Sequence, residues 1–284
     1  MKQILLLVAL ALSPAISFAQ QKPAYVLYNA AGKKVSYGKM LRTLADKDIV
    51  LFGEYHNNPI AHWLQLETTK DLHGRRALVL GAEMFEADNQ ESLDRYLRGE
   101  IDAKGLDTLA RLWSNYKTDY APLVNFARAN KLVFAATNIP RRYASRESKG
   151  GFEVLDTLSA LEKTWTAPLP MAYDLELPGY KNMLAMMGGH GGPNLPKAQA
   201  SKDATMAHFI LKYYRPGSLF LHFNGAYHSD NYEGILWYLR RQRPELKYAT
   251  ITTVSQKDIH KLLAEHKGKA DFILCVDEDM TTTY

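Results

Sequence analysis

Short apolar runs alternate with segments of helical periodicity along most of this chain. Six of these runs have the length of a buried strand: 49–54, 77–84, 132–138, 219–223, 248–254 and 272–276. Most of them are apolar at consecutive positions, which is typical of strands that are covered on both faces. Segments with helical spacing separate them, beginning with a helix predicted after Pro59. This order predicts an α/β fold with a mainly parallel sheet flanked by helices.

Two stretches depart from this alternation. Near the start, residues 25–28 and 34–37 flank a turn at 29–32, and this pattern predicts an N-terminal β-hairpin. Between residues 140 and 196 the alternation stops, and turns rich in Gly and Pro interrupt the chain. We therefore expect a single α/β domain over 20–284, in which 140–196 form a helical insertion.

The first 19 residues have the pattern of a secretory signal peptide. Lys2 precedes an apolar run over 4–12, and small residues around Ala19 provide a cleavage site. The run is too short to span a membrane. The residue directly after Ala19 is not a cysteine, so we do not expect a lipid anchor there. We predict an exported protein that is periplasmic or associated with the cell surface.

Composition and charge narrow the classes of partner. The chain has 35 Lys and Arg against 30 Asp and Glu, but the two signs are interleaved without a basic stripe. We therefore do not expect a nucleic-acid partner, because such a surface concentrates its positive charge. The single cysteine, Cys275, lies within an apolar run, and we expect it to be a buried and unreactive thiol.

Carboxylates and imidazoles follow the ends of the predicted central strands. Glu54 ends the first run and His56 lies just past it, Glu83 lies at the end of the second, and His228 follows the fourth within another Gly-x-x-His sequence. Because parallel strands end at one edge of a sheet, these four side chains should form a cluster. Such a cluster can hold a divalent metal ion, or work as an acid/base pair without one. The structural alternative is that the histidines cap loops and Glu54 accepts backbone hydrogen bonds.

A polar stripe follows in the helix after the first strand. His62, Gln65 and Thr69 are three and four positions apart, so they share one face of that helix. For Thr69 we expect a solvated position. For His62 and Gln65, which lie near the strand end, a supporting role and solvation are equally favoured.

These sequence blocks resemble the ChaN-like haem-binding family. The resemblance rests on 51–59 followed by His62 and Gln65, on 81–85 with Gln90, on 203–207 and on 225–228. The wider superfamily includes Tiki metalloproteases and erythromycin-esterase-like hydrolases, whose paired Gly-x-x-His sequences and acids match the four strand-end residues. The resemblance implies haem binding in bacterial iron acquisition, with an axial tyrosine, a histidine at the propionates and a dimer around two haems. An outer-membrane haem receptor is a further partner consistent with it.

The resemblance does not identify the tyrosine, so the chemistry of the insertion has to select it. Haem requires an apolar slot, an axial ligand and polar groups for its propionates, and the segment 178–190 offers all three. The candidates are Tyr180 as ligand with Tyr173 next, His190 as ligand or propionate contact, Lys181 as propionate partner, and Met183 and Met187 as apolar lining. A helix that only packs in the core is the alternative.

We therefore expect an exported haem-binding protein, and a binding protein more than an enzyme. The alternative function is a metal-dependent hydrolase, an esterase or peptidase, that uses the four strand-end residues. The two hypotheses place their chemistry in different parts of the chain, since haem would be held by the insertion and the metal by the strand ends.

Overall fold

The computed structural model describes residues 22–186 and 192–284. Within them, one sheet contains the strands β1 (Tyr25–Asn29), β2 (Ile49–Glu54), β3 (Leu78–Glu86), β4 (Val133–Asn138), β5 (Leu219–Gly225), β6 (Tyr248–Gln256) and β7 (Phe272–Asp277). The predicted signal peptide and two of the haem candidates, Met187 and His190, lie outside the described residues.

The strand order is β1-β7-β6-β2-β5-β3-β4. All neighbouring pairs are parallel except β1 and β7, which are antiparallel. The central strands β2 and β5 are buried along their whole length, as their uninterrupted apolar sequences require. The predicted α/β class with a mainly parallel sheet is confirmed.

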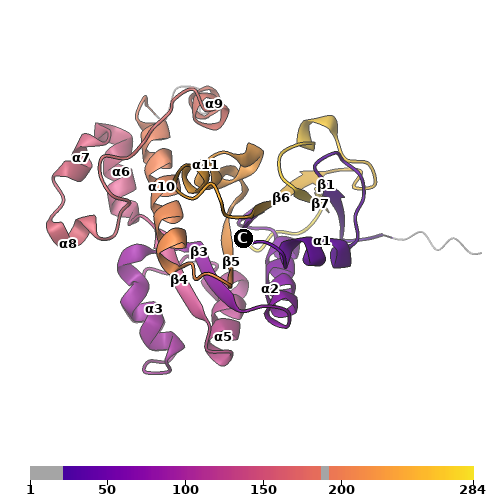
Figure 1. Ribbon diagram of the computed structural model, residues 1–284, viewed down its shortest axis with the longest axis horizontal. Coiled ribbons are helices and arrows are strands. Elements are labelled where there is room, and N and C mark those ends of the chain that lie inside the picture. Colours follow the sequence, from indigo (N-terminus) through magenta and orange to yellow (C-terminus); the bar gives the residue numbers. More distant parts are fainter. Residues whose placement is uncertain (1–21, 187–191) are drawn as a thin grey trace, which may run out of the picture.

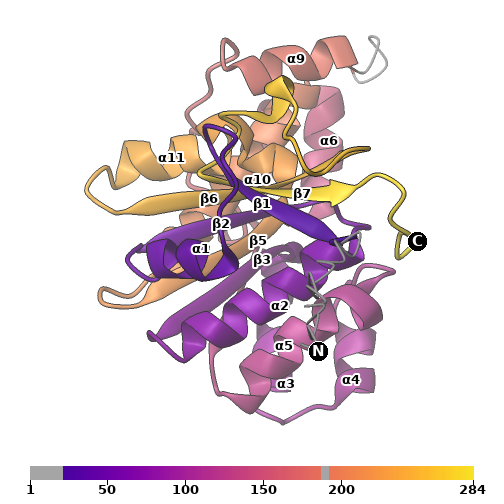
Figure 2. The same cartoon turned by 90° about the vertical axis from the view of Figure 1, so that its right-hand side faces the viewer.

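Helices cover both faces of the sheet (Figures 1 and 2). One face packs against α1 (Tyr37–Leu44), α2 (Pro59–His73), α3 (Gln90–Leu97) and α5 (Ala121–Ala129), whose apolar side chains join the larger core cluster with α4 (Ala103–Leu109). The other face packs against α10 (Leu195–Tyr213) and α11 (Ile235–Gln242). The carboxyl ends of the parallel strands are left between these layers, where ligands bind in such folds.

The N-terminal turn forms less of a hairpin than its sequence predicts. Gly32 turns the chain with a φ of +76°, but the returning segment makes only one β-bridge, between Tyr28 and Lys34. Ser36 then caps α1, with its Oγ accepting from the Lys39 amide at 3.2 Å, so the chain leaves the sheet. The main partner of β1 is β7, which pairs with it over five residues.

The range 140–196 contains four short helices in its described part. These are α6 (Arg141–Gly150), α7 (Glu153–Asp156), α8 (Ala160–Lys163) and α9 (Pro178–Met186). A small core that includes Tyr143, Leu155 and Leu158 holds the first of them together. That residues 140–196 form an insertion in the α/β domain stays a prediction.

Two further features bear on the predictions. The thiol of Cys275 is free and fully buried on β7, as expected, and burial raises its pKa to about 12. No helix in the described ranges is both long and apolar enough to cross a membrane.

Candidate functional site

Glu54, the last residue of β2, is buried and surrounded by hydrogen-bond donors. Its Oε1 accepts from the hydroxyl of Tyr120 and from His56 Nδ1, both at 2.8 Å. Its Oε2 accepts from Gln65 Nε2 at 2.6 Å, and His62 Nδ1 lies 3.3 Å away. Burial by itself raises the pKa of Glu54, but the contacts with His56 and His62 outweigh it and hold the pKa below the ordinary value. The carboxylate therefore stays ionised inside the protein.

The polar stripe of α2 turns inward. His62, Gln65 and Thr69 are all buried, so the expectation of a solvated Thr69 is wrong. The Thr69 hydroxyl donates to the Gln65 carbonyl at 2.7 Å, within the same helix. His62 Nε2 lies 3.0 Å from the backbone oxygen of His56, which fixes the loop after β2. Glu54 and the His56 carbonyl each contact one of these side chains, whereas His62 Nδ1 and Gln65 Oε1 have no hydrogen-bond partner within the described residues.

Glu83 reaches the same site from the end of β3. The pairing between β3 and β4 shifts register between Ala82 and Glu86, so three residues of β3 face one of β4. Glu83 lies within this irregular stretch, and its Oε2 accepts from the Gly225 amide at 2.7 Å. Its Oε1 lies 3.2 Å from His228 Nε2.

His228 lies between two buried carboxylates. Its Nδ1 is 2.5 Å from Asp203 Oδ1, and its Nε2 faces Glu83. Burial lowers the pKa of His228, but the charges of Glu83 and Asp203 outweigh burial and raise it to about 10. Burial raises the pKa of Glu83, and the imidazolium of His228 more than reverses this, so Glu83 stays ionised. The three side chains form a buried carboxylate–imidazolium–carboxylate group.

Gly225 separates the two histidine–carboxylate groups. A Cβ added to Gly225 would lie 2.8 Å from His56 Nε2 and 3.4 Å from Glu83 Oε2, so only glycine fits between them. The structure therefore brings Glu54, His56, Glu83 and His228 together. The described residues contain no group of three or more His, Cys, Asp or Glu arranged to hold a metal ion. The divalent metal expected from the sequence has no support there.

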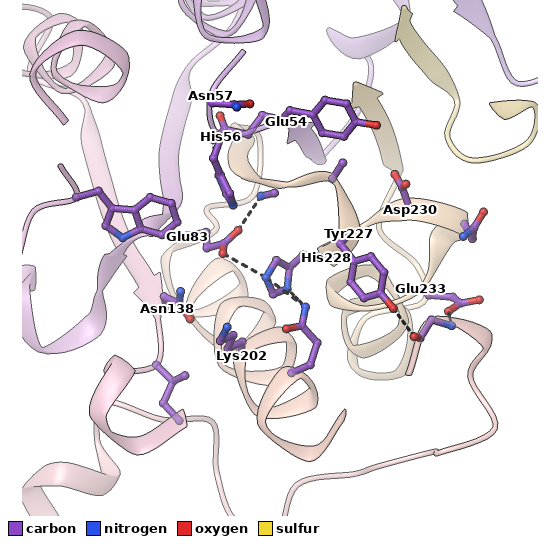
Figure 3. A pocket seen from close by; sticks show the side chains of 18 of the residues that line it. Glu54, His56, Asn57, Glu83, Asn138, Lys202, Tyr227, His228, Asp230 and Glu233 are labelled. Atoms are coloured by element: carbon purple, nitrogen blue, oxygen red, sulfur yellow. Dashed lines mark hydrogen bonds and ion pairs between the residues drawn. The ribbon is translucent and has the colours of Figure 1, made fainter. Parts of the chain in front are cut away.

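A pocket of about 1120 Å³ opens above this cluster. Its floor is the strand edge, and Figure 3 shows His56, Glu83 and His228 reaching into it. Aromatic side chains line its walls and rim: Tyr55, Trp113, Tyr227 and Tyr284. Basic side chains also line it: Arg141, Lys202 and Lys269. The pocket is thus a large, mixed cavity with tyrosine hydroxyls and cations available to a ligand.

The haem candidates of α9 lie beside this pocket rather than in its lining. Tyr180 is 3% exposed, and its hydroxyl donates to Asp203 Oδ2 at 2.7 Å. Burial and the Asp203 charge raise the pKa of Tyr180 far above its usual range. Half-buried Tyr173 stacks on Tyr180 with ring centroids 5.9 Å apart. Met183 is half-buried and Lys181 pairs with Glu176 on the surface.

Several residues of the site were missed in the sequence. Asp203 appeared only as part of a sequence block, and nothing in that block marked its carboxylate as the partner of His228. Tyr120 and Lys202 also gave no signal, because each comes from an element whose orientation the sequence does not specify. Asn138 was missed although its place at the end of a predicted strand could have marked it. A buried acid in a helix of small residues, such as Asp203 beside Ala200 and Ala204, is the one hint that was available.

The fold and the pocket together define a class of protein. A doubly covered, mainly parallel sheet with a large pocket at its carboxyl edge is the architecture of an α/β ligand-binding protein or enzyme. A family model described as haem-binding uptake, Tiki superfamily, ChaN, matches residues 40–239. This chain belongs to that family, as the sequence blocks had suggested.

Solved structures agree with this fold. ChaN of Campylobacter jejuni, described with cofacial haem binding, is 18% identical with a TM-score of 0.66, and the match covers 92% of this chain and 97% of that one. A protein of Bacillus cereus is 12% identical with a TM-score of 0.51, covering 84% and 90%. At such identities the likeness shows a shared fold. A comparison with curated proteins found no significant match.

Proposed function

We propose that this protein binds haem in the pocket at the carboxyl edge of the sheet and serves in bacterial haem acquisition. The observation that carries the proposal is the combination of family membership with a pocket of about 1120 Å³ lined by tyrosines and cations. Pockets for small molecules are commonly about 300–1,000 Å³, so this one has room for a flat macrocycle.

The donor set of the pocket fits a haem. A ferric haem needs an anionic or imidazole axial ligand, apolar contact for its faces and partners for two carboxylates. Tyr227 is 40% exposed, lines the pocket and donates its hydroxyl to the Gly179 carbonyl. Trp113 packs edge-on against His56 with ring centroids 4.8 Å apart and offers an aromatic wall. Bound haem would supply an iron centre for redox or transport chemistry, while the chain's residues bind and orient it.

We place the axial ligand on the side of the pocket where α9 meets Tyr227. Tyr180, the ligand expected from the sequence, adjoins Gly179, whose carbonyl accepts from Tyr227. Ligation by Tyr180 requires its hydroxyl to leave Asp203, whereas Tyr227 has only a backbone carbonyl to leave. Either phenolate would reach a haem from the same side, and single variants separate the two.

Export, dimerisation and a receptor are part of the same proposal. The first 19 residues would direct the chain across the membrane, and a second protomer would cover the open face of the haem. An outer-membrane haem receptor is the partner that such a role requires.

Haemin titration of the purified protein, followed by absorbance, tests the proposal. The expected result is a saturable, high-spin ferric spectrum with a charge-transfer band of phenolate ligation. The band should be abolished by Tyr180→Phe if Tyr180 is the ligand, and by Tyr227→Phe if Tyr227 is. Tyr25→Phe on the edge strand β1 is the matched control and should keep the band. Failure of the wild-type protein to saturate would refute haem binding, and a band that survives in both variants would refute the assigned side.

Hydrolysis is a second candidate function, favoured by one observation. The side chain of His56 is 30% exposed while its Nδ1 contacts buried Glu54 at 2.8 Å. A histidine that a carboxylate orients, with its other nitrogen open to a pocket, can act as a general base on water. Turnover of an ester and peptide panel by the wild-type protein, lost in His56→Ala, would support it. Wild-type rates equal to those of buffer would dismiss it.

A further inference from the structure

One corner of the pocket gathers groups that attract anions. Asn138 ends β4, Arg141 begins α6, and Lys202 lies in the middle of α10, and all three line the pocket. Figure 3 shows Asn138 and Lys202 on the same side of the cavity, opposite Asp230 and Glu233. Three elements far apart in the sequence therefore contribute to this corner, which we call the β4–α6–α10 corner.

Asn138 is the first evidence that the corner awaits a ligand. Its side chain is about nine-tenths buried, and its Oδ1 has no hydrogen-bond partner among the described residues. A buried amide without a partner is unfavourable unless water or a ligand satisfies it. Because a half-turn exchanges its oxygen and its N–H₂ group, Asn138 can present either a donor or an acceptor to the cavity.

The cations of the corner form no ion pair in the described part of the chain. Arg142 is held by Asp88 at 2.6 Å, and Arg111 contacts Glu86 at 2.9 Å. Arg141 and Lys202, by contrast, have no carboxylate within ion-pair distance in residues 22–186 and 192–284. Arg141 is exposed and Lys202 is half-buried, so both keep their charge available to the pocket.

The start of α6 adds to this charge. No side chain caps the N-terminus of this ten-residue helix, although the Tyr143 amide already donates to the Pro140 carbonyl at 2.8 Å. The positive end of the helix dipole points to the same corner. The nearby acids do not cancel it, because Glu83 is paired with His228 and Glu86 with Arg111.

We propose that the β4–α6–α10 corner is a carboxylate-binding subsite that orients the pocket's ligand. Arg141 and Lys202 would bind the carboxylate as charged donors, and Asn138 would donate its amide hydrogens. Glu233, on the opposite side, disfavours the reversed orientation, while Asp230 there is paired with Lys269 at 3.8 Å. Where the ligand is haem, which rests on the function proposed above, the carboxylate is a propionate.

The test compares each ligand with a form whose carboxylates are blocked. Wild-type protein should bind haemin at least about tenfold tighter than haemin dimethyl ester, as expected for charge-assisted hydrogen bonds. Lys202→Met and Arg141→Gln should each reduce this preference several-fold and leave the affinity for the ester unchanged. Lys212→Met, exposed on the same helix α10 and outside the pocket lining, is the control and should keep the wild-type preference.

A haem-independent arm separates this inference from the proposed function. Binding of 4-phenylbutyrate and 4-phenylbutyramide is measured by calorimetry on the same proteins, with circular dichroism as a check of folding. Preference for the acid, lost in Lys202→Met and in Asn138→Asp, supports the subsite even if haemin does not bind. Suppose that haemin saturates the wild-type protein, but Lys202→Met and Arg141→Gln still bind haemin more tightly than its dimethyl ester by the wild-type factor. The subsite is then refuted and haem binding stands. If haemin fails and the acid is not preferred over the amide, both proposals fall.

Discussion

Replacing Glu147 by glutamine should remove a pH dependence from the stability of this protein. Glu147 is fully buried on α6, where it faces α10. Ser201 donates to its Oε1 at 2.5 Å, and its Oε2 has no hydrogen-bond partner within the described residues. A carboxylate in this position is poorly compensated, and burial raises the pKa of Glu147 to about 8 from its ordinary value of 4.5.

The direction of the effect follows from proton binding. Between pH 4.5 and about 8 the folded protein keeps the Glu147 proton and the unfolded chain has lost it, so stability falls as pH rises. The contribution is fully present below pH 4.5 and is lost by the time the pH passes about 8. Each pKa unit corresponds to about 1.4 kcal/mol, so the full loss is about 5 kcal/mol. This is an upper limit, because the helices can relax and admit water around an ionised carboxylate.

Urea unfolding at several pH values from 5 to 9 measures the effect. Wild-type protein and Glu147→Gln should have similar free energies of unfolding at pH 5, because both side chains are neutral there. By pH 9 the variant should be more stable by several kcal/mol. Glu153→Gln, an exposed site in the neighbouring helix α7, is the control and should track the wild-type protein. A difference between wild type and Glu147→Gln that stays constant from pH 5 to 9 would refute the reasoning.

Three further predictions concern the site. Gly225→Ala should destabilise the protein by about 1–3 kcal/mol in urea unfolding, because its Cβ would lie 2.8 Å from His56 Nε2. His228→Asn should cost about 3–5 kcal/mol, because it leaves Glu83 and Asp203 as buried carboxylates without their cation. The difference in free energy of unfolding between wild type and His228→Asn should be largest below pH 6.5. It should decline as the pH rises toward about 10, where His228 loses its proton in the folded protein. Haemin should shift the protein from monomer to dimer in light scattering.

Each of these has an outcome that contradicts it. An unfolding curve of Gly225→Ala that overlays the wild-type curve would show that His56 can move without cost. A His228→Asn variant as stable as the wild type at pH 6 would mean that the two carboxylates are protonated or solvated. One molar mass with and without haemin would count against the dimer.

The edge of the sheet where the site forms could be predicted from sequence because the central strands are apolar on both faces. Runs such as 49–54 and 219–223 can only be satisfied inside a covered parallel sheet, whose strands end together. That topology is enough to bring Glu54, His56, Glu83 and His228 to one place. The spacing of Gly53 and Gly225 from the histidines then marks where each strand stops.

The rotation of the helices was not determined in this way. In α10 small and apolar residues are buried around much of the circumference, so periodicity does not reveal that Asp203 faces His228 while Lys202 faces the pocket. In α9, only packing against α10 turned the Tyr180 hydroxyl to Asp203. The stripe of α2 likewise turned inward because Glu54 was there to receive it.

The sequence by itself thus determined the sheet, the strand ends and the family, because these depend on local apolar patterns and short sequence blocks. Only the tertiary structure decided which carboxylates share His228, where the pocket opens and which cations face its β4–α6–α10 corner. The physical reason is that a buried charge needs a partner, and that partner can come from any element which packing brings within hydrogen-bonding distance. Its position along the chain carries no record of that contact.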